Sequence, residues 1–400
     1  MKRILYVHYQ KNASEGSIVH VTRFSHAFRT LCQAAGIDFQ VIAPPTVFIP
    51  PGEERPRLGG RLRRILGKYY LRELKVILQQ IRKAWQERAL LKAWQPDIVL
   101  TRYDAETLSI HWAGRSLGLP VVTEFNGKDR GELAGTYLDH KQIPLLNRLF
   151  SNCNALKWSA GAMAVSDDIA DDMRACNPQN KPVIVNHNGV DLAEFDPQLD
   201  CSALRQSLDI PAGAVVVGYI GSFIIWHAPD RLFRAFASLL DQGVDAYLLL
   251  VGRKLPETAA MIDAAGPRVA ARVRHAGFVP HAHIPQHLAL MDIAVLPKTQ
   301  AYCSPLKLFE YMAMAKACLV PATSTIASIL DHDREGLLFD PESEADFTAD
   351  LLRLASDREL RQRLGHAARQ RVEAEYTWDH NAERVMQLLI NAQSWHANNQ

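Results

Sequence analysis

Apolar and polar positions follow two periods along the chain, which predicts strands and helices in regular succession. Short apolar runs bounded by Gly, Pro or polar residues indicate buried strands, and apolar residues with helical spacing separate most of the runs. In the first half we expect strands at residues 4–7, 39–43, 97–101, 121–125, 162–165 and 183–185. In the second half we expect them at residues 215–220, 246–251, 273–276, 293–296 and 318–321.

This alternation predicts an α/β protein with two doubly wound, Rossmann-like parallel sheets. A length of 400 residues also favours two domains over one. The composition loosens between residues 196 and 213, so we place a first domain at 1–200 and a second at 201–375. Residues 376–400 complete the first domain, because an amphipathic helix at 378–392 is expected to return to it. Ligands of such folds bind beyond the carboxyl ends of the strands, here in a cleft between the domains.

The segment at 293–321 carries the clearest ligand signal, because its polar residues gather between a strand and a helix. Ser304 and Pro305 are predicted as N-cap and first residue of the helix, which puts Lys307 in the first turn, where the helix dipole disfavours a cation. A phosphate at this helix N-terminus would resolve the conflict. Glu310 shares a face with Lys307 and could accept hydrogen bonds from sugar hydroxyls. A Lys–Glu pair on an ordinary surface helix would give the same pattern.

Other predicted strands also end in residues suited to a ligand. Gly16, next to Ser17, stands at a strand-to-helix turn, where the absence of a Cβ lets a ligand approach, although tight turns use Gly in any case, and the strand at 215–220 ends in Gly221-Ser222. Glu124 and Asn126 close the strand at 121–125, where a carboxylate that caps the loop is the structural alternative. Arg253 and Lys254 follow another strand, and exposed loop charges explain them equally well.

Composition narrows the class of protein. A formal net charge of +2 argues against a dedicated nucleic-acid-binding protein. The six cysteines show neither a CxxC pair nor zinc spacing, so we expect free thiols in a reducing cytoplasm. The apolar start of the chain is too short for a signal peptide, and no run of 18 or more apolar residues predicts a membrane span. We therefore expect a cytoplasmic protein.

One basic segment, at residues 61–92, has the pattern of an interfacial helix. Apolar residues at 62, 65, 66, 69 and 70 form a stripe flanked by Arg and Lys, which would suit the anionic inner face of the plasma membrane. A solvated helix face remains the alternative explanation.

Taken in order, several motifs resemble those of glycosyltransferase family 4, retaining enzymes with the two-domain GT-B architecture, over nearly the whole chain. The motifs are Gly16-Ser17 followed by His20, Asn188-Gly189-Val190-Asp191 with Phe195, Gly221-Ser222-Phe223, SPLKLFEYMA at 304–313, EGLLF at 335–339 and YTWD at 376–379.

The resemblance implies a nucleotide-sugar donor, such as a UDP- or GDP-sugar, bound mainly by the second domain. By position, Glu310 would bind the donor ribose, and Lys307 with the amides of the preceding loop, which includes Ser304, would meet the diphosphate. Gly221 and Ser222 would approach the phosphates, and Phe278 would lie near the base. Gly16 and Ser17 would let the donor approach the first domain. The resemblance implies no cofactor and no metal, if the helix dipole and cations stabilise the departing diphosphate.

Three residues depart from the family pattern. Tyr302 stands where a Glu normally contacts the transferred sugar, His227 corresponds most nearly to a usual Lys, and Asn126 stands where many members have His. Arg253 or Lys307 would then carry the positive charge. Asn126 cannot transfer a proton but can hold a sugar hydroxyl. Retention without a clear nucleophile implies that the leaving phosphate takes the acceptor proton, with Glu124 as base or nucleophile in the alternative.

We expect sugar transfer to a glycan or lipid-linked acceptor, in the synthesis of a surface or exported polysaccharide. Two alternatives remain open. A sugar-nucleotide 2-epimerase of related two-domain fold would need acid and base groups on both sides of one sugar, and no such pair is evident. A degenerate, non-catalytic nucleotide-sugar-binding subunit would account for Tyr302, His227 and Asn126.

Overall fold

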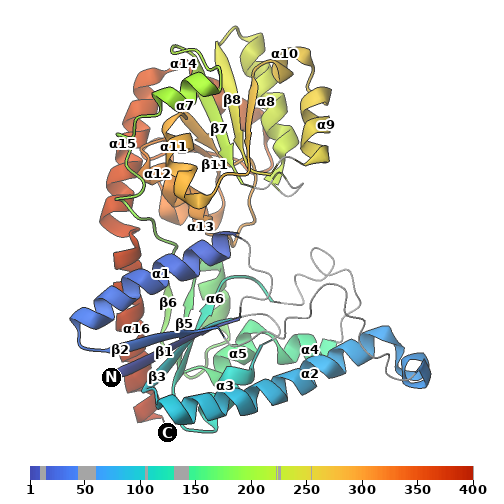
Figure 1. Ribbon diagram of the computed structural model, residues 1–400, viewed down its shortest axis with the longest axis vertical. Helices are drawn as coiled ribbons and strands as arrows, with labels where there is room; N and C mark the ends of the chain where they lie inside the picture. Colours follow the sequence, from blue (N-terminus) through green and yellow to red (C-terminus); the bar gives the residue numbers. More distant parts are fainter. Residues whose placement is uncertain are drawn as a thin grey trace. The chain divides into compact units, whose positions relative to one another are not determined.

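The computed structural model describes residues 1–9, 15–43, 60–103, 107–129, 144–221, 223, 227–253 and 255–399. Contacts divide the chain into two compact units: Met1–His187 with Asn381–Gln400, and Asn188–His380. Each unit contains one parallel six-stranded sheet (Figure 1).

The first unit is built on a sheet with the strand order β2-β1-β3-β4-β5-β6. Its strands are β1 (Arg3–His8), β2 (Asp38–Ile42), β3 (Ile98–Arg102), β4 (Val121–Phe125), β5 (Gly161–Ala164) and β6 (Val183–Val185). Its helices are α1 (Glu15–Ala34), α2 (Gly60–Trp94), α3 (Ser109–Arg115), α4 (Pro144–Leu149), α5 (Asn152–Trp158), α6 (Asp167–Ala175) and most of α16 (Trp378–Asn398). The long α2 packs along α3 (Figure 1).

The second unit repeats this plan with the strand order β12-β11-β10-β7-β8-β9. Its strands are β7 (Val215–Ile220), β8 (Ala246–Val251), β9 (Val273–Gly277), β10 (Ile293–Val295), β11 (Ala317–Pro321) and β12 (Leu337–Phe339). Its helices are α7 (Ser202–Ser207), α8 (Pro229–Asp241), α9 (Pro256–Ala264), α10 (Pro267–Ala270), η2 (His281–His283), α11 (Ile284–Ala289), α12 (Leu306–Ala313), α13 (Ser324–Ile329), α14 (Glu344–Ser356) and α15 (Arg358–Glu375). Helix α8 packs on α14, and α12 packs on α15.

The predicted α/β class with two doubly wound sheets is confirmed. Every predicted strand is present within about a residue of its expected ends, because buried parallel strands read as continuous apolar runs. Strand β12 was missed. The last helix also behaves as expected: Val385, Leu388 and Leu389 are fully buried, and a Cβ on Gly161 of β5 would lie 3.1 Å from Ala392. Helix α16 therefore packs on the first sheet.

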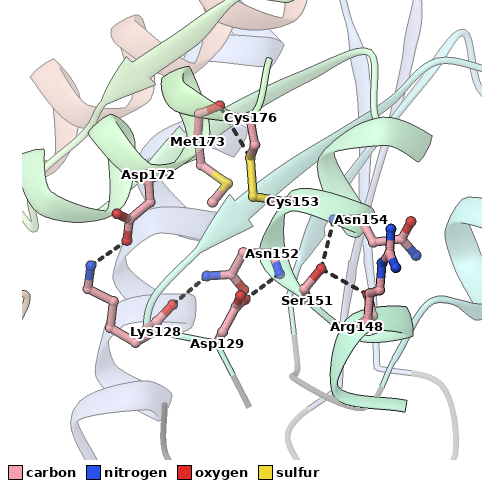
Figure 2. The surroundings of a disulfide bond; sticks show 11 residues. Lys128, Asp129, Arg148, Ser151, Asn152, Cys153, Asn154, Asp172, Met173 and Cys176 are labelled. Atoms are coloured by element: carbon pink, nitrogen blue, oxygen red, sulfur yellow. Dashed lines mark hydrogen bonds and ion pairs between the residues drawn. A yellow bond between two sulfur atoms is a disulfide. The ribbon is translucent and has the colours of Figure 1, made fainter. Parts of the chain in front are cut away.

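The expectation of free thiols is wrong for two of the six cysteines. Cys153 near the start of α5 forms a disulfide with Cys176, the residue after α6 (Figure 2). The other four, Cys32, Cys201, Cys303 and Cys318, are free. The disulfide joins two helices that also hold the loop after β4: the side-chain nitrogen of Asn152 donates to the Gly127 carbonyl at 2.9 Å, and Asp172 of α6 pairs with Lys128 (Figure 2).

Candidate functional site

The second sheet places its functional residues where its strand order reverses. Strand β7 lies between β8 and β10, so the chain leaves β7 on one side and returns on the other. Beyond the carboxyl ends of β7 and β10 lie Gly221 and the loop that leads into α12. Ligands of doubly wound sheets bind at such a switch point.

Gly221 and Lys307 are close together at this point. A Cβ on Gly221 would lie 2.4 Å from Nζ of Lys307, and Gly221 has a φ of +138°. Both the backbone conformation and the lysine therefore require a residue without a side chain. The structure thus joins two positions that are far apart in the sequence and that were both predicted to meet the phosphates.

Lys307 lies in the first turn of α12 without a carboxylate bonded to it. Its Nζ lies 3.5 Å from the Tyr219 hydroxyl and 4.7 Å from the centre of that ring, and no salt bridge to it occurs among the described residues. Burial lowers the pKa of Lys307 to about 8, and the charge of Glu310 only partly offsets this effect. A partly desolvated cation without a bonded anion is unfavourable for the protein alone. An anionic ligand would remove that cost.

The start of α12 differs from the prediction. Pro305, rather than Ser304, is the N-cap residue, and no side chain caps the helix. Ser304 is instead fixed by its carbonyl, which accepts a hydrogen bond from the Asn188 side chain at 2.5 Å. Its buried hydroxyl has no hydrogen-bond partner within the described part of the chain. The Leu308 amide donates to the Pro305 carbonyl at 3.0 Å, so the two helix amides before it and this hydroxyl remain for an acceptor such as a phosphate oxygen.

His227 joins the Gly221–Lys307 group but adds no charge to it. Its ring lies 6.3 Å from that of Tyr219, and its Nδ1 lies 3.4 Å from the Lys298 carbonyl. Burial, and then the charge of Lys307, lower the pKa of His227 to about 4. His227 is therefore neutral near pH 7 and cannot replace the lysine of the family pattern as a cation.

Arg253 and Phe278 form a second group, at the carboxyl ends of β8 and β9. The guanidinium of Arg253 lies 5.5 Å from the centre of the Phe278 ring, and 49% of Phe278 is exposed. An exposed aromatic ring beside a cation is suited to stacking on a planar base.

Glu310, one turn after Lys307, is bonded to a residue that the sequence did not single out. Its Oε1 accepts a hydrogen bond from Nε2 of His281 at 2.8 Å, and only 8% of Glu310 is exposed. His281 lies in η2, just after Phe278. Tyr302 is half-buried in the loop between β10 and α12.

The edge of the first sheet holds a different cluster, centred on Glu124 of β4. Its carboxylate lies 2.8 Å from Nε2 of His20 and 3.6 Å from Nη1 of Arg102, and the Tyr6 hydroxyl donates to it at 3.2 Å. Burial alone would raise the pKa of Glu124, but the nearby His20 and Arg102, with a smaller effect of Asn126, outweigh burial and lower the pKa to about 2. Glu124 is 1% exposed and fully ionised, so it is a weak proton acceptor.

The remaining predicted residues are only partly placed. Gly16 and Ser17 lie within the first turn of α1, which begins at Glu15, and not in a turn before the helix as expected. Ser222 and Lys254 fall outside the described residues, as do the side chains at 61–74. In the described ranges, no group of three His, Cys, Asp or Glu residues is arranged to hold a metal ion.

Two family models match the chain. The model described as "Glycosyltransferase Family 4" matches residues 16–194, and the one described as "Glycosyl transferases group 1" matches residues 214–357. The matches therefore cover both units, including both sheet edges described above.

Individual relatives are distant. A D-inositol 3-phosphate glycosyltransferase of Nocardioides sp. is 27% identical over 228 residues, which are 53% of this chain and 49% of that protein. A GDP-mannose-dependent alpha-(1-6)-phosphatidylinositol dimannoside mannosyltransferase of Mycobacterium tuberculosis is 29% identical over 202 residues, half of each chain. The matched regions thus span about half the length of these two relatives.

Similarity of structure extends over the whole chain. The crystal structure of HepE from Anabaena, in complex with UDP, has a TM-score of 0.71 at 16% sequence identity, covering 98% of this chain and 100% of that chain. At this identity the likeness concerns the fold.

Proposed function

Because the chain belongs to glycosyltransferase family 4 and has the GT-B fold, we propose that it is a retaining glycosyltransferase that uses a nucleotide-sugar donor. Its donor would be a UDP- or GDP-sugar. The names of similar proteins support both nucleotides, since HepE was crystallised with UDP and the mycobacterial relative is GDP-mannose-dependent.

One observation carries this proposal: Lys307 is a half-buried cation at the switch point of the second sheet, and it faces a glycine that leaves room beside it. A diphosphate supplies the missing negative charge, and the uncapped start of α12 supplies amide donors for it. During transfer, negative charge grows on the departing diphosphate. Lys307 and the helix N-terminus would stabilise this charge most strongly in the transition state.

The other predicted donor residues take roles consistent with their surroundings. Glu310 would accept hydrogen bonds from the ribose hydroxyls, and Phe278 with Arg253 would stack on the base. Gly221 would let the phosphates approach, and Ser304 would donate its free hydroxyl. Tyr302, in the same loop as Ser304, would contact the transferred sugar in place of the usual Glu.

In the first unit we propose separate roles for Glu124 and Asn126. Glu124 is held ionised by His20 and Arg102, so it would fix the sheet edge electrostatically and would not act as base or nucleophile. Asn126 would hold a sugar hydroxyl. Proton transfer from the acceptor to the leaving phosphate then requires no protein base, and protein groups supply position and charge.

The test is donor binding measured by isothermal titration calorimetry. UDP or GDP should bind the wild type, and Lys307→Ala and Glu310→Ala should each weaken binding by roughly 1.5 to 3 kcal/mol if these residues make charge-assisted hydrogen bonds. His283→Ala, an exposed residue of η2, serves as a control. Wild-type affinity in both site variants would refute the site.

A turnover assay then separates the three functions. Labelled UDP- or GDP-sugars are incubated with polysaccharide and lipid extracts. Label transferred to an extract component supports the transferase, whereas an epimerised nucleotide sugar supports the 2-epimerase. Tight nucleotide binding without either product supports a non-catalytic subunit.

For the acceptor we propose a glycan or lipid-linked molecule of surface or exported polysaccharide synthesis. The names of the two relatives, one acting on D-inositol 3-phosphate and one on a phosphatidylinositol dimannoside, support acceptors that carry phosphate or lipid.

We also propose that α2 contacts an anionic membrane surface. Helix α2 contains ten Lys or Arg residues and two Glu. Within its described side chains, Leu78, Ile81 and Trp85 are 57%, 45% and 70% exposed and lie on one helical face, with exposed Lys75 and Arg82 beside them. None of the described helices is long and apolar enough to cross a membrane. The arrangement fits a helix that lies on lipid headgroups.

Liposome flotation tests this contact. The wild type should float with vesicles containing anionic lipid and remain unbound with purely zwitterionic vesicles. The variant Leu78→Ser/Ile81→Ser/Trp85→Ser should lose binding, whereas Ile390→Ser, which removes an exposed apolar residue of α16, should retain it. Equal flotation of the triple variant would contradict the assignment.

A further inference from the structure

His281 is held in one orientation by three residues from different parts of the second unit. Its Nε2 lies 2.8 Å from Oε1 of Glu310, and its Nδ1 lies 3.9 Å from Oε1 of Glu194. The ring also packs edge-on against Phe195, with the centres of the two rings 5.7 Å apart. The distance to Glu194 is too long for a direct hydrogen bond, whereas the one to Glu310 is well within range. Because a carboxylate only accepts, the Nε2 nitrogen donates its proton to Glu310.

This hydrogen bond restricts what Glu310 can do. A carboxylate has two oxygens, and His281 occupies Oε1. Within the described residues, Oε2 of Glu310 has no hydrogen-bond partner. A Glu side chain has three rotatable bonds, so an unsupported carboxylate would lose considerable freedom on binding a ligand. A carboxylate already fixed through one oxygen loses much less.

We propose that His281 is a positioning residue for the donor nucleoside. It orients Glu310 so that Oε2 faces the vicinal hydroxyls of the ribose, and it does not itself touch the donor. The inference rests on the proposed function, because it assigns a role only if Glu310 binds ribose. It also explains why the segment after β9 carries both Phe278, near the base, and His281, behind the ribose ligand.

A structural pair that merely stabilises α12 would look similar in the unliganded protein. The two roles differ in what they predict for ligands that lack a ribose hydroxyl. A positioning role affects binding of the ribose and leaves binding of the diphosphate unchanged. A structural role would affect both, because Lys307 lies on the same helix.

The experiment measures affinities of UDP, its 2′-deoxy analogue and pyrophosphate for the wild type, His281→Ala, His281→Gln and the control His283→Ala. If the wild type binds GDP better, GDP and its 2′-deoxy analogue are used. His281→Ala should weaken nucleoside diphosphate binding roughly 5- to 20-fold, less than removal of Glu310 itself, because Glu310 remains and loses only its fixed orientation. It should also reduce the preference for the ribonucleotide over the deoxynucleotide, with pyrophosphate affinity unchanged.

Rescue provides the second readout. The amide nitrogen of Gln can occupy nearly the place of Nε2, so His281→Gln should restore much of the affinity and of the ribose preference. If His281→Ala binds the nucleotide with wild-type affinity and wild-type preference for ribose, this inference is wrong, and the proposed function still stands. Equal losses for nucleotide and pyrophosphate would also overturn the inference, in favour of a structural role. Failure of the wild type to bind either nucleotide would refute the proposed function, and this inference with it.

Discussion

The edges of the two sheets hold their buried charges in opposite ways. In the first unit, the carboxylate of Glu124 lies 2.8 Å from Nε2 of His20 and 3.6 Å from Nη1 of Arg102, so its charge is balanced within the protein. In the second unit, the described residues place the Tyr219 hydroxyl 3.5 Å from Nζ of Lys307 and no carboxylate in a salt bridge with it, and the nearby Glu310 is bonded to His281. The pKa of Glu124 falls to about 2 and that of Lys307 to about 8. The first shift favours the charged form, whereas the second opposes it.

The difference teaches which edge requires a ligand. A balanced charge contributes to the stability of the fold and needs nothing further. An unbalanced one costs stability, and such residues concentrate at functional sites. Both edges contain a residue with a shifted pKa, so the existence of a shift does not distinguish them. The direction of the shift does, because only an unfavourable charge needs a ligand.

The largest expected effect is on the balanced edge. Glu124→Gln removes the anion but leaves His20 and Arg102 buried, so the free energy of unfolding should fall by about 3 to 5 kcal/mol at pH 7. The folded pKa lies below the ordinary value, so this contribution is present above about pH 4.5 and is lost as the pH falls toward 2. Denaturant unfolding measures it. The control is Glu383→Gln, on the exposed face of α16 in the same unit. Equal stability of the two variants would show that the interactions of Glu124 with His20 and Arg102 do not stabilise the fold.

Removal of the disulfide should change the stability of the first unit. The bond closes a segment with a sequence separation of 23 within the first unit, so Cys153→Ser/Cys176→Ser should lower the free energy of unfolding by about 3 kcal/mol. A dithiol reductant should have the same effect on the wild type and none on the variant. Cys201→Ser in the second unit is the control. If the reductant leaves the unfolding curve of the wild type unchanged, the disulfide between Cys153 and Cys176 is not formed.

The sequence predicted the layout of both sheets because burial on two faces leaves a local apolar pattern. Strand β12 was missed because Leu337–Phe339 is short and was interpreted only as part of a family motif. The start of α12 was placed one residue early because Ser304 has the residue type of a cap. Its carbonyl is instead bonded to Asn188, 116 residues away, and local pattern carries no information about that contact.

The candidate site was predictable as a set of positions but not as a set of contacts. Lys307 could be singled out from its place in the helix, and the resemblance supplied Gly221. His281 could not be singled out, because it is one of three histidines in the segment at 281–287 and only the tertiary fold brings it to Glu310. The cysteine pair was missed for the same reason, since a separation of 23 residues matches no recognisable spacing.

On the unbalanced edge, stability and binding should change in opposite directions. Lys307→Met removes a cation whose burial is unfavourable, so the free energy of unfolding should rise by about 1 to 2 kcal/mol at pH 7. Donor affinity should fall in the same variant. Wild-type affinity should also decline as the pH rises past about 8, where Lys307 loses its proton.

The matched control is Lys316→Met. Lys316 is also half-buried with a pKa lowered by burial, but its Nζ donates to the Ala289 carbonyl at 3.0 Å. Its substitution should therefore raise the free energy of unfolding less than Lys307→Met does and leave donor affinity unchanged. Thermal unfolding with and without UDP or GDP measures both quantities. If Lys307→Met is less stable than the wild type and binds the donor with normal affinity, the charge of Lys307 stabilises the fold and does not bind the donor.

The last effect, no larger than that of Lys307→Met, concerns Glu87 of α2, a buried carboxyl in the same unit as Glu124. Burial raises its pKa to about 7, against hydrogen bonds from Tyr9 and Ser109 and the charge of Lys83. The unfolded chain ionises first, so wild-type stability should decline as the pH rises from about 4.5 to 7.

Glu87→Gln keeps both hydrogen bonds as acceptor, so it should be more stable than the wild type by about 1 to 2 kcal/mol at pH 8 and equal to it near pH 5. Unfolding curves at the two pH values decide the matter. A difference that does not depend on pH would mean that Glu87 stays ionised at both pH values. The first unit would then stabilise a second buried carboxylate besides Glu124.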